Sequence, residues 1–196
     1  MKLIADSGST KTDWCVVDGG KAVFRFSGQG INPYQQGEDV IENIVMEEAA
    51  GQLGDIGKIT EIEFYGAGCR DEKIAVVEGV LRRTFANAGR GEVCSDMLGA
   101  ARALFGIDEG IACILGTGAN SCLYDGKRVA ANVPPLGYIL GDEGSGAVLG
   151  RLFINALFKG GLPVTMRDEF LNATGLTLAD IINKVYREPL ANRFLA

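Results

Sequence analysis

Residues 3–20 of the chain read LIADSGSTKTDWCVVDGG, which is an apolar strand, a turn of small and hydroxyl residues, a second strand and an Asp-Gly hairpin signal. The same features return in the same order at residues 111–127, which read IACILGTGANSCLYDGK. Any two β-hairpins can share an Asp-Gly turn, but the shared Gly and Thr in the first turn of each copy favour a duplication. The pattern therefore predicts two related half-domains, each presenting a turn rich in N–H and O–H groups.

The segments that follow the first copy alternate between helix and strand patterns. Apolar periodicity predicts three helices and two strands there, at residues 37–53, 71–88 and 96–105 and at residues 59–65 and 91–95. The inner side of the first helix is expected to carry Val40, Ile41, Ile44, Val45 and Leu53. A later helix is expected to bury Leu149, Leu152, Phe153, Ala156 and Leu157. Strands that alternate with helices indicate an α/β fold with a parallel or mixed sheet.

Length and composition limit the domain count and the chemistry. The 196 residues allow one large or two small domains, and the repeat favours a division into residues 1–105 and 106–196. The chain has no His, which excludes a Ser-His-Asp triad, a Cys-His dyad and His-ligated zinc. Any general base must therefore be a carboxylate, Lys, Tyr or Cys.

Net charge and cysteine usage indicate which partners and which cellular compartment to expect. The formal net charge is −6 and no basic run occurs, which argues against a nucleic-acid or membrane-surface role. No apolar stretch reaches the ~18 residues of a membrane span, and Asp6 makes the N-terminus unlike a signal peptide. The five cysteines lie in or beside apolar segments without a C-x-x-C pair, which predicts buried, reduced thiols and a cytoplasmic location.

The two Gly/Thr/Ser turns carry the first candidate chemistry. Backbone N–H groups and hydroxyls in such turns can donate to the oxygens of a polyphosphate without bulky side chains in the way. The chain has neither a Walker loop nor a G-x-G-x-x-G after a strand. Asp6, where the first strand enters its turn, could hold a hydrated Mg²⁺ beside the phosphates, or it could only cap the turn.

Two further carboxylates begin apolar helices. Asp96 follows the strand that ends at Ser95, and Asp142 follows the Gly/Pro-rich loop at residues 134–137. Each could be a helix cap and nothing more, because Asp is a common residue at that position. Two acidic helix starts together with two phosphate-type turns nevertheless favour a functional site.

These motifs, in this order, resemble a known family. The residues that carry the resemblance are the turn at 6–12, Ser95-Asp96, Gly116-Thr117-Gly118-Ala119-Asn120 and Gly141-Asp142-Glu143-Gly144-Ser145. They are similar to the N-acetylglucosamine kinase branch of the sugar kinase/Hsp70/actin superfamily, which is grouped with the BadF/BadG/BcrA/BcrD ATPases. The resemblance runs from position 3 to about position 160, and the second pair of motifs is the more specific.

The resemblance implies a fold and a reaction. The fold would be two RNase H-like (actin-like ATPase) domains with ATP and sugar in the cleft between them. Relatives are longer, so the second domain would be incomplete in this chain and the adenine-binding residues would lie beyond residue 196. The reaction would transfer the γ-phosphoryl group of ATP, with Mg²⁺, to the 6-hydroxyl of N-acetylglucosamine or glucosamine.

The resemblance also implies roles for individual residues. Asp96 would accept the proton of the sugar hydroxyl, and Asp6 would lie near Mg²⁺. The phosphates of ATP would be contacted by Ser9, Thr10, Lys11 and Thr117. The sugar would be contacted by Asp96 and by residues of both copies, namely Asn32, Ala119, Asn120, Gly137 and Asp142.

The chain departs from the family at one wall of the sugar site, where Leu136-Gly137-Tyr138 replaces Gly-Trp-Gly, so the preferred sugar stays open. Two other functions also stay open. One is a BadF-type ATPase that activates a partner protein through an iron–sulfur cluster, which needs Cys ligands; Cys113 and Cys122 are expected to be buried. The other is a non-catalytic sugar-sensing module. The expected partners are an amino sugar and ATP, without nucleic acid or membrane, and a homodimer is compatible with this picture.

Overall fold

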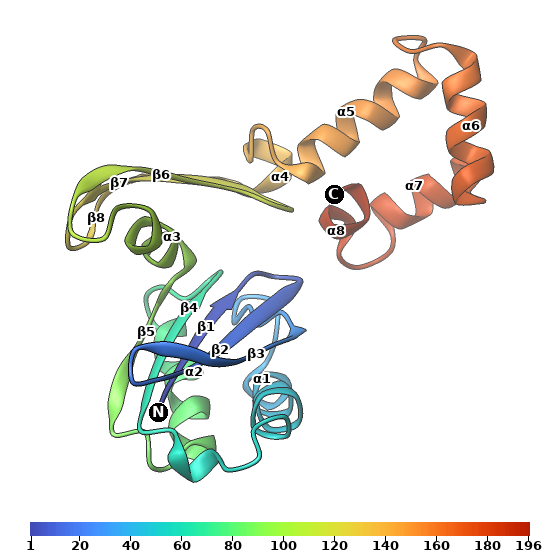
Figure 1. Ribbon diagram of the computed structural model, residues 1–196. Helices are drawn as coiled ribbons and strands as arrows, with labels where there is room; N and C mark the ends of the chain where they lie inside the picture. The colour runs from blue at the N-terminus through green and yellow to red at the C-terminus, as the bar shows by residue number, and fades with distance from the viewer. The chain divides into compact units, whose positions relative to one another are not determined.

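The computed structural model describes all 196 residues, which form two compact units (Figure 1). The first unit comprises Met1–Ala112 with Leu123–Ala130, and the second comprises Cys113–Cys122 with Ala131–Ala196. Each unit is described by itself below, and the boundary expected between residues 105 and 106 stays a prediction. None of the helices combines the length and the apolar character needed to cross a lipid bilayer.

The first unit is built on a five-stranded mixed sheet, drawn from blue to green in Figure 1. The strands lie in the order β3-β2-β1-β4-β5, with the bounds β1 (Lys2–Ser7), β2 (Lys11–Asp18), β3 (Lys21–Gln29), β4 (Glu61–Gly66) and β5 (Arg90–Ser95). Strand β2 is antiparallel to β1 and β3, whereas β1, β4 and β5 are parallel. This order, with one reversed strand, is that of an RNase H-like domain, so the predicted fold class is confirmed.

The two faces of this sheet follow from the alternation of residues along its strands. Leu3 and Ala5 of β1 are fully buried on one face, whereas Lys2 and Asp6 lie on the other. The buried face packs against α1 (Glu38–Ile44) and α2 (Lys73–Thr84) in one hydrophobic core. The opposite face carries charged residues and is contacted by α3 (Asp96–Phe105).

The first predicted helix differs from expectation in two ways. It is α-helical only from Glu38 to Ile44, then continues as a π-helical segment at Val45–Ala50 and ends at Gly51. The wider turn of the π-helix breaks the 3.6-residue period from which one continuous helix was predicted. Val40 faces solvent instead of the core, because Ile41, Ile44 and Val45 are the buried side chains there. A short 3₁₀ helix at Ile56–Lys58 leads into β4.

The second copy of the hairpin forms a separate three-stranded sheet. Its order is β6-β7-β8, with β6 at Glu109–Leu115, β7 at Ala119–Asp125 and β8 at Val129–Val133. Turns of three residues join these strands, and so short a link permits only antiparallel pairing. The order β6-β7-β8 repeats β1-β2-β3, which agrees with the duplication seen in the sequence. No fourth or fifth strand follows within these residues.

Helices follow this second sheet. Their bounds are α4 (Gly137–Leu140), α5 (Gly146–Phe158), α6 (Val164–Thr174), α7 (Leu178–Tyr186) and α8 (Ala191–Leu195). Helix α5 contacts α6 and α8, and the missing side chain of Gly150 lets the backbone of α8 come close. Leu149 and Leu152 were predicted to be buried, but they are 57% and 56% exposed, and Phe153 is 39% exposed. Helix α5 is apolar on more than one side, and the elements of this chain cover only the side with Ala147, Val148 and Leu157.

The cysteines are all free, but they are not uniformly buried. Cys69 and Cys122 are buried, Cys15 and Cys94 are half-buried, and Cys113 is exposed, so the expectation of a buried Cys113 is wrong. In β6 the alternation places Ala112 inward and its neighbour Cys113 outward. Burial raises the pKa of the Cys69 thiol to about 12, which keeps it protonated and unreactive.

Candidate functional site

The first turn is held by hydroxyl groups at its base. The hydroxyls of Ser7 and Thr12 are 2.6 Å apart and buried, where β1 ends and β2 begins. Thr12 Oγ1 donates to the carbonyl of Gln29 at 2.9 Å, and the Ile31 N–H donates to Ser7 Oγ at 2.9 Å. These bonds fix the turn and the segment after β3 to each other. The predicted phosphate-binding residues Ser9, Thr10 and Lys11 lie above them at the tip of the hairpin.

The tip of this turn touches the predicted sugar ligand Asn32. Gly30 N–H donates to the Thr10 carbonyl at 3.1 Å, and a Cβ at Gly30 would collide with the Gly8 backbone. This close approach brings Asn32, which is 8% exposed, to the turn, where its Nδ2 donates to Ser9 Oγ at 2.9 Å. The structure therefore brings Ser9, a predicted phosphate contact, and Asn32, a predicted sugar contact, together.

Asp6 and Asp96 lie at the carboxyl ends of β1 and β5, on either side of β4. The strand register pairs Asp6 with Tyr65 of β4 and pairs Tyr65 with Cys94 of β5. The carboxyl edge of a parallel sheet is where α/β folds bind ligands. Asp6 makes no side-chain hydrogen bond or salt bridge in the structure, so it does not cap the turn.

The sequence also allowed Asp96 to be only a helix cap, and that interpretation does not fit the structure. Ser95 is the N-cap of α3, and its side chain accepts a hydrogen bond from the Leu98 N–H at 3.4 Å. Asp96 is the first residue of the helix, and its Oδ1 accepts from its neighbour Met97 N–H at 2.9 Å. Apart from the N–H groups of Met97 and of Asp96 itself, no group of the protein donates a hydrogen bond to this carboxylate. The helix start is therefore capped without Asp96, which leaves this carboxylate available for chemistry.

The electrostatics of the two carboxylates favour proton uptake. Desolvation raises the pKa of Asp96, the Met97 N–H lowers it, and the negative charge of Asp6 raises it further. The net result is a pKa above that of an ordinary Asp. Desolvation is also the main reason that the pKa of Asp6 is raised, followed by the charge of Asp13. A half-buried carboxylate with a raised pKa is a suitable general base for a hydroxyl.

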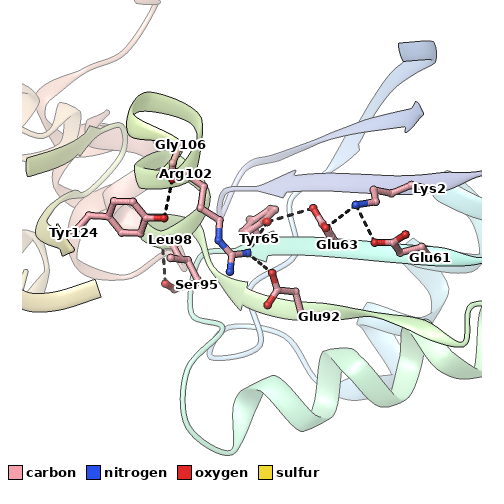
Figure 2. Close-up of polar contacts among 10 residues, drawn as sticks. All are labelled: Lys2, Glu61, Glu63, Tyr65, Glu92, Ser95, Leu98, Arg102, Gly106 and Tyr124. Carbon is pink, nitrogen blue, oxygen red and sulfur yellow. Dashed lines mark hydrogen bonds and ion pairs between the residues drawn. The ribbon is translucent and has the colours of Figure 1, made fainter. Parts of the chain in front are cut away.

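A chain of polar contacts fixes α3, and thereby Asp96, on the sheet (Figure 2). Arg102 of α3 donates to the Tyr65 hydroxyl at 2.9 Å and forms an ion pair with Glu92. The Tyr65 hydroxyl in turn donates to Glu63 at 3.3 Å, and Glu63 accepts from Lys2 at 2.7 Å. The Tyr65 ring lies directly under α3, where a side chain at position 99 would collide with it.

Sequence reasoning missed this support of α3. A signal was present, because the residues of β4 on this face, Glu61, Glu63 and Tyr65, are all polar and alternate with Ile62 and Phe64. Such alternation marks a face that is not a plain hydrophobic core. Which helix residue would reach Tyr65 could not be predicted, because it depends on how α3 crosses the sheet.

In the second unit, a matching turn sits on the start of α5. Gly116 N–H donates to the Gly118 carbonyl at 2.9 Å, and the first N–H of α5, at Gly146, donates to the Gly116 carbonyl at 2.8 Å. Thr117, the predicted second phosphate contact, is at the tip of this turn. The Ala147 N–H donates to the Thr117 carbonyl at 3.3 Å, so the first N–H groups of α5 hold the second turn in place.

Asp142 belongs to the same turn. It is 9% exposed, and its Oδ1 accepts a hydrogen bond from the Ala119 N–H at 3.2 Å. Its backbone is left-handed, with φ of 56°, and Ser145 rather than Asp142 caps α5. The structure thus joins Thr117, Ala119 and Asp142 within one unit, and the helix-cap explanation of Asp142 does not fit.

Two predicted sugar contacts remain, Asn120 and Gly137. Asn120 Oδ1 accepts from its neighbour Ser121 N–H at 2.9 Å and from Asn132 Nδ2 at 2.8 Å. Gly137 begins the short helix α4 in an exposed position, with a left-handed φ of 76°. No side-chain or backbone bond joins Gly137 to Asp142 directly, although the adjacent Gly141 N–H donates to the Gly137 carbonyl.

The residues present fit a magnesium ion held partly by the substrate. No group of three or more His, Cys, Asp or Glu residues is arranged to hold a metal ion. Mg²⁺ commonly binds to one or two carboxylates and completes its shell with water and substrate phosphates. The unpaired Asp6 carboxylate next to the first turn meets that lesser requirement.

Comparisons with known proteins agree with this geometry. A Porphyromonas gingivalis protein of solved structure, provisionally named an N-acetylglucosamine kinase, is 55% identical over 100% of this chain, with a TM-score of 0.97; the match covers 69% of that protein. A Chromobacterium violaceum protein with the same provisional name is 20% identical, with a TM-score of 0.69, over 99% of this chain and 71% of that protein; it supports the fold alone. No protein-family model and no curated protein matches the chain.

Proposed function

The chain belongs to the N-acetylglucosamine kinase family within the actin-like ATPase superfamily, and from that membership we propose that it transfers the γ-phosphoryl group of ATP to the 6-hydroxyl of an amino sugar. N-acetylglucosamine is the first candidate substrate, and glucosamine is the second. One observation carries the proposal: Asp96 is a desolvated carboxylate at the carboxyl edge of the sheet. It is not the N-cap of α3, because Ser95 occupies that position.

In this mechanism Asp96 orients the sugar hydroxyl and accepts its proton as the phosphoryl group transfers. An anionic base of this kind needs only to position the nucleophile and take one proton, because charge stabilisation comes mainly from groups around the phosphates. Met97 N–H holds one Asp96 oxygen at 2.9 Å, so the other oxygen is the one we assign to the sugar hydroxyl.

The phosphates are assigned to the two turns. Ser9, Thr10 and Lys11 of the first turn and Thr117 of the second donate hydrogen bonds from hydroxyl, amine and backbone N–H groups to phosphate oxygens. Mg²⁺, held on the protein side by Asp6, supplies charge neutralisation on the phosphates when it is bound.

The sugar is assigned to Asn32 in the first unit and to Ala119, Asn120, Gly137 and Asp142 in the second. Asn32 and Asp142 suit this role because both are largely buried and already oriented by hydrogen bonds. We place the reaction in the cytoplasm, since none of the five cysteines is paired in a disulfide.

The test is ATP consumption by the protein with Mg²⁺, with and without a panel of amino sugars. We expect sugar-dependent ADP release and a sugar 6-phosphate product that can be identified by NMR. Sugar-independent hydrolysis would instead support a partner-activating ATPase, and sugar binding without any ATP consumption would support a sugar-sensing module. Either of these results would overturn the kinase assignment.

A further inference from the structure

Two cations share one aromatic ring beside the proposed sugar site. Tyr34 is 51% exposed and lies two residues after Asn32. The guanidinium carbon of Arg70 is 5.4 Å from the centre of the Tyr34 ring, and Lys73 Nζ is 5.5 Å from it. Contacts of this kind hold a cation in place while leaving its remaining N–H donors free. We call this group of three residues the Tyr34 clamp.

Neither cation of the clamp has a salt-bridge partner in the protein. Arg70 and Lys73 form no salt bridge and no side-chain hydrogen bond in the structure, although the two residues between them include Asp71 and Glu72. By contrast, Arg82, Arg83 and Arg102 nearby are each paired with a Glu. The Asp96 carboxylate acts on Arg70 only from beyond salt-bridge distance, so both cations keep N–H donors available to a bound anion.

The position of the clamp ties it to the acceptor side of the site. Asn32 Oδ1 accepts from the backbone N–H of Tyr34 at 3.0 Å, so the backbone that carries the ring is bonded to the proposed sugar ligand. Arg70 lies in the loop after β4, and Gly68 of that loop, with φ of 77°, packs against Asn32 where a side chain would collide. The charge of Arg70 also acts on Asp96, whose pKa it lowers.

We propose that the Tyr34 clamp binds the phosphoryl group once it has been transferred, so that Arg70 and Lys73 hold the phosphate ester of the sugar product. The proposal rests on the proposed kinase function. N-acetylglucosamine, the first candidate acceptor, is neutral, and the anion that the reaction creates on it is the ester at the hydroxyl for which Asp96 is the proposed base. A phosphate monoester carries close to two negative charges at neutral pH, which match the two cations.

The experiment compares the binding of two ligands by calorimetry, N-acetylglucosamine and its 6-phosphate, without ATP. We expect the wild type to bind the 6-phosphate at least about tenfold more tightly than the neutral sugar, as for bonds to a charged group. The double variant Arg70→Ala, Lys73→Ala should lose that preference while its affinity for the neutral sugar is unchanged. The matched control Lys21→Ala, Lys127→Ala removes the same charge from exposed positions and should keep the preference.

The outcomes separate this proposal from the kinase assignment. If the neutral sugar binds but the 6-phosphate binds no better, or if the double variant keeps the preference, the clamp proposal is overturned while the kinase assignment stands. If neither N-acetylglucosamine nor its 6-phosphate binds, the proposed function fails, and the clamp proposal, which rests on it, fails with it. An amino sugar with a carboxylate substituent serves as a third ligand. If that ligand alone gains affinity from the clamp, the anion belongs to the substrate and our assignment to the transferred phosphoryl group is wrong.

Discussion

Replacing Asp96 by Asn tests the central residue of the proposed mechanism, because the change removes the charge and preserves the shape. Asn keeps a carbonyl oxygen that can accept from Met97 N–H, so the start of α3 should be undisturbed. It cannot accept the proton of the sugar hydroxyl. Loss of a general base should lower kcat by roughly 10²–10⁴, which corresponds to about 2.7–5.5 kcal/mol of barrier at 1.36 kcal/mol for each factor of ten.

The same substitution should raise stability at neutral pH. The pKa of Asp96 is raised in the folded protein, chiefly by desolvation, so the folded state binds this proton more tightly than the unfolded state does. Above the folded pKa, the ionised group therefore destabilises the fold. That cost disappears as the pH falls through the folded pKa toward the unfolded value of 3.8. Asn, which is never charged, should unfold at a higher temperature than the wild type at pH 7, and the gap should narrow toward pH 4.

Three measurements on this one variant decide whether Asp96 is the general base. ADP release at saturating sugar measures kcat, calorimetry measures sugar affinity, and thermal unfolding at pH 7 and pH 4 measures stability. If Asp96 is the general base, the Asn variant should have a lower kcat, near-normal sugar affinity and higher stability than the wild type. A purely structural Asp96 predicts that activity and stability fall together, and an Asn variant with unchanged kcat would refute our assignment outright.

Three further predictions concern the supports of the site and the surface. Thr10→Val and Thr117→Val should each weaken Mg·ATP affinity by about 1–3 kcal/mol through loss of a hydroxyl donor to a charged oxygen; a raised KM for sugar with an unchanged KM for ATP would contradict the phosphate assignment. Tyr65→Ala removes the ring under α3 and should lower kcat by about tenfold or more through misplacement of the base, whereas Tyr65→Phe keeps the ring and most of the activity; equal losses in steady-state kinetics would exclude the platform role. Leu149→Ser, Leu152→Ser should reduce self-association measured by light scattering and change the unfolding midpoint little, since both side chains are more than half exposed; a large drop in the midpoint would show that they are buried in solution.

The local features of the fold could be predicted because they depend on neighbours along the chain. The strand-turn-strand pattern at residues 3–20 and its repeat at residues 111–127 became the hairpins β1-β2 and β6-β7. Helix α3 has the predicted bounds, because Ser95 caps its first turn and Gly106, with φ of 61°, ends it. Each of these signals is written in a few consecutive residues.

Contacts between distant segments could not be predicted in the same way. Apolar periodicity indicates that a helix has an apolar side, but not whether another element will cover it, and Leu149 and Leu152 show the difference. The support of Asp96 likewise depends on Lys2, Glu63 and Arg102, which come from three separate elements. Their meeting is decided by strand order and by the crossing of α3, neither of which leaves a mark in the local sequence.

The capping residues show how the structure turns an ambiguous pattern into a functional argument. Taken alone in the sequence, Asp96 is as compatible with a helix cap as with a site residue, and Asp142 is also compatible with a cap. In the structure, Ser95 and Ser145 fill both cap positions, so neither Asp is needed to start its helix. Asp96 is instead desolvated, which carries a cost that capping does not require, and Asp142 is buried against the second turn, where it accepts from the Ala119 N–H. Because Asp96 is desolvated and is not the cap of its helix, we propose a chemical role for it, and this is the reason that the Asn substitution at position 96 is expected to separate activity from stability.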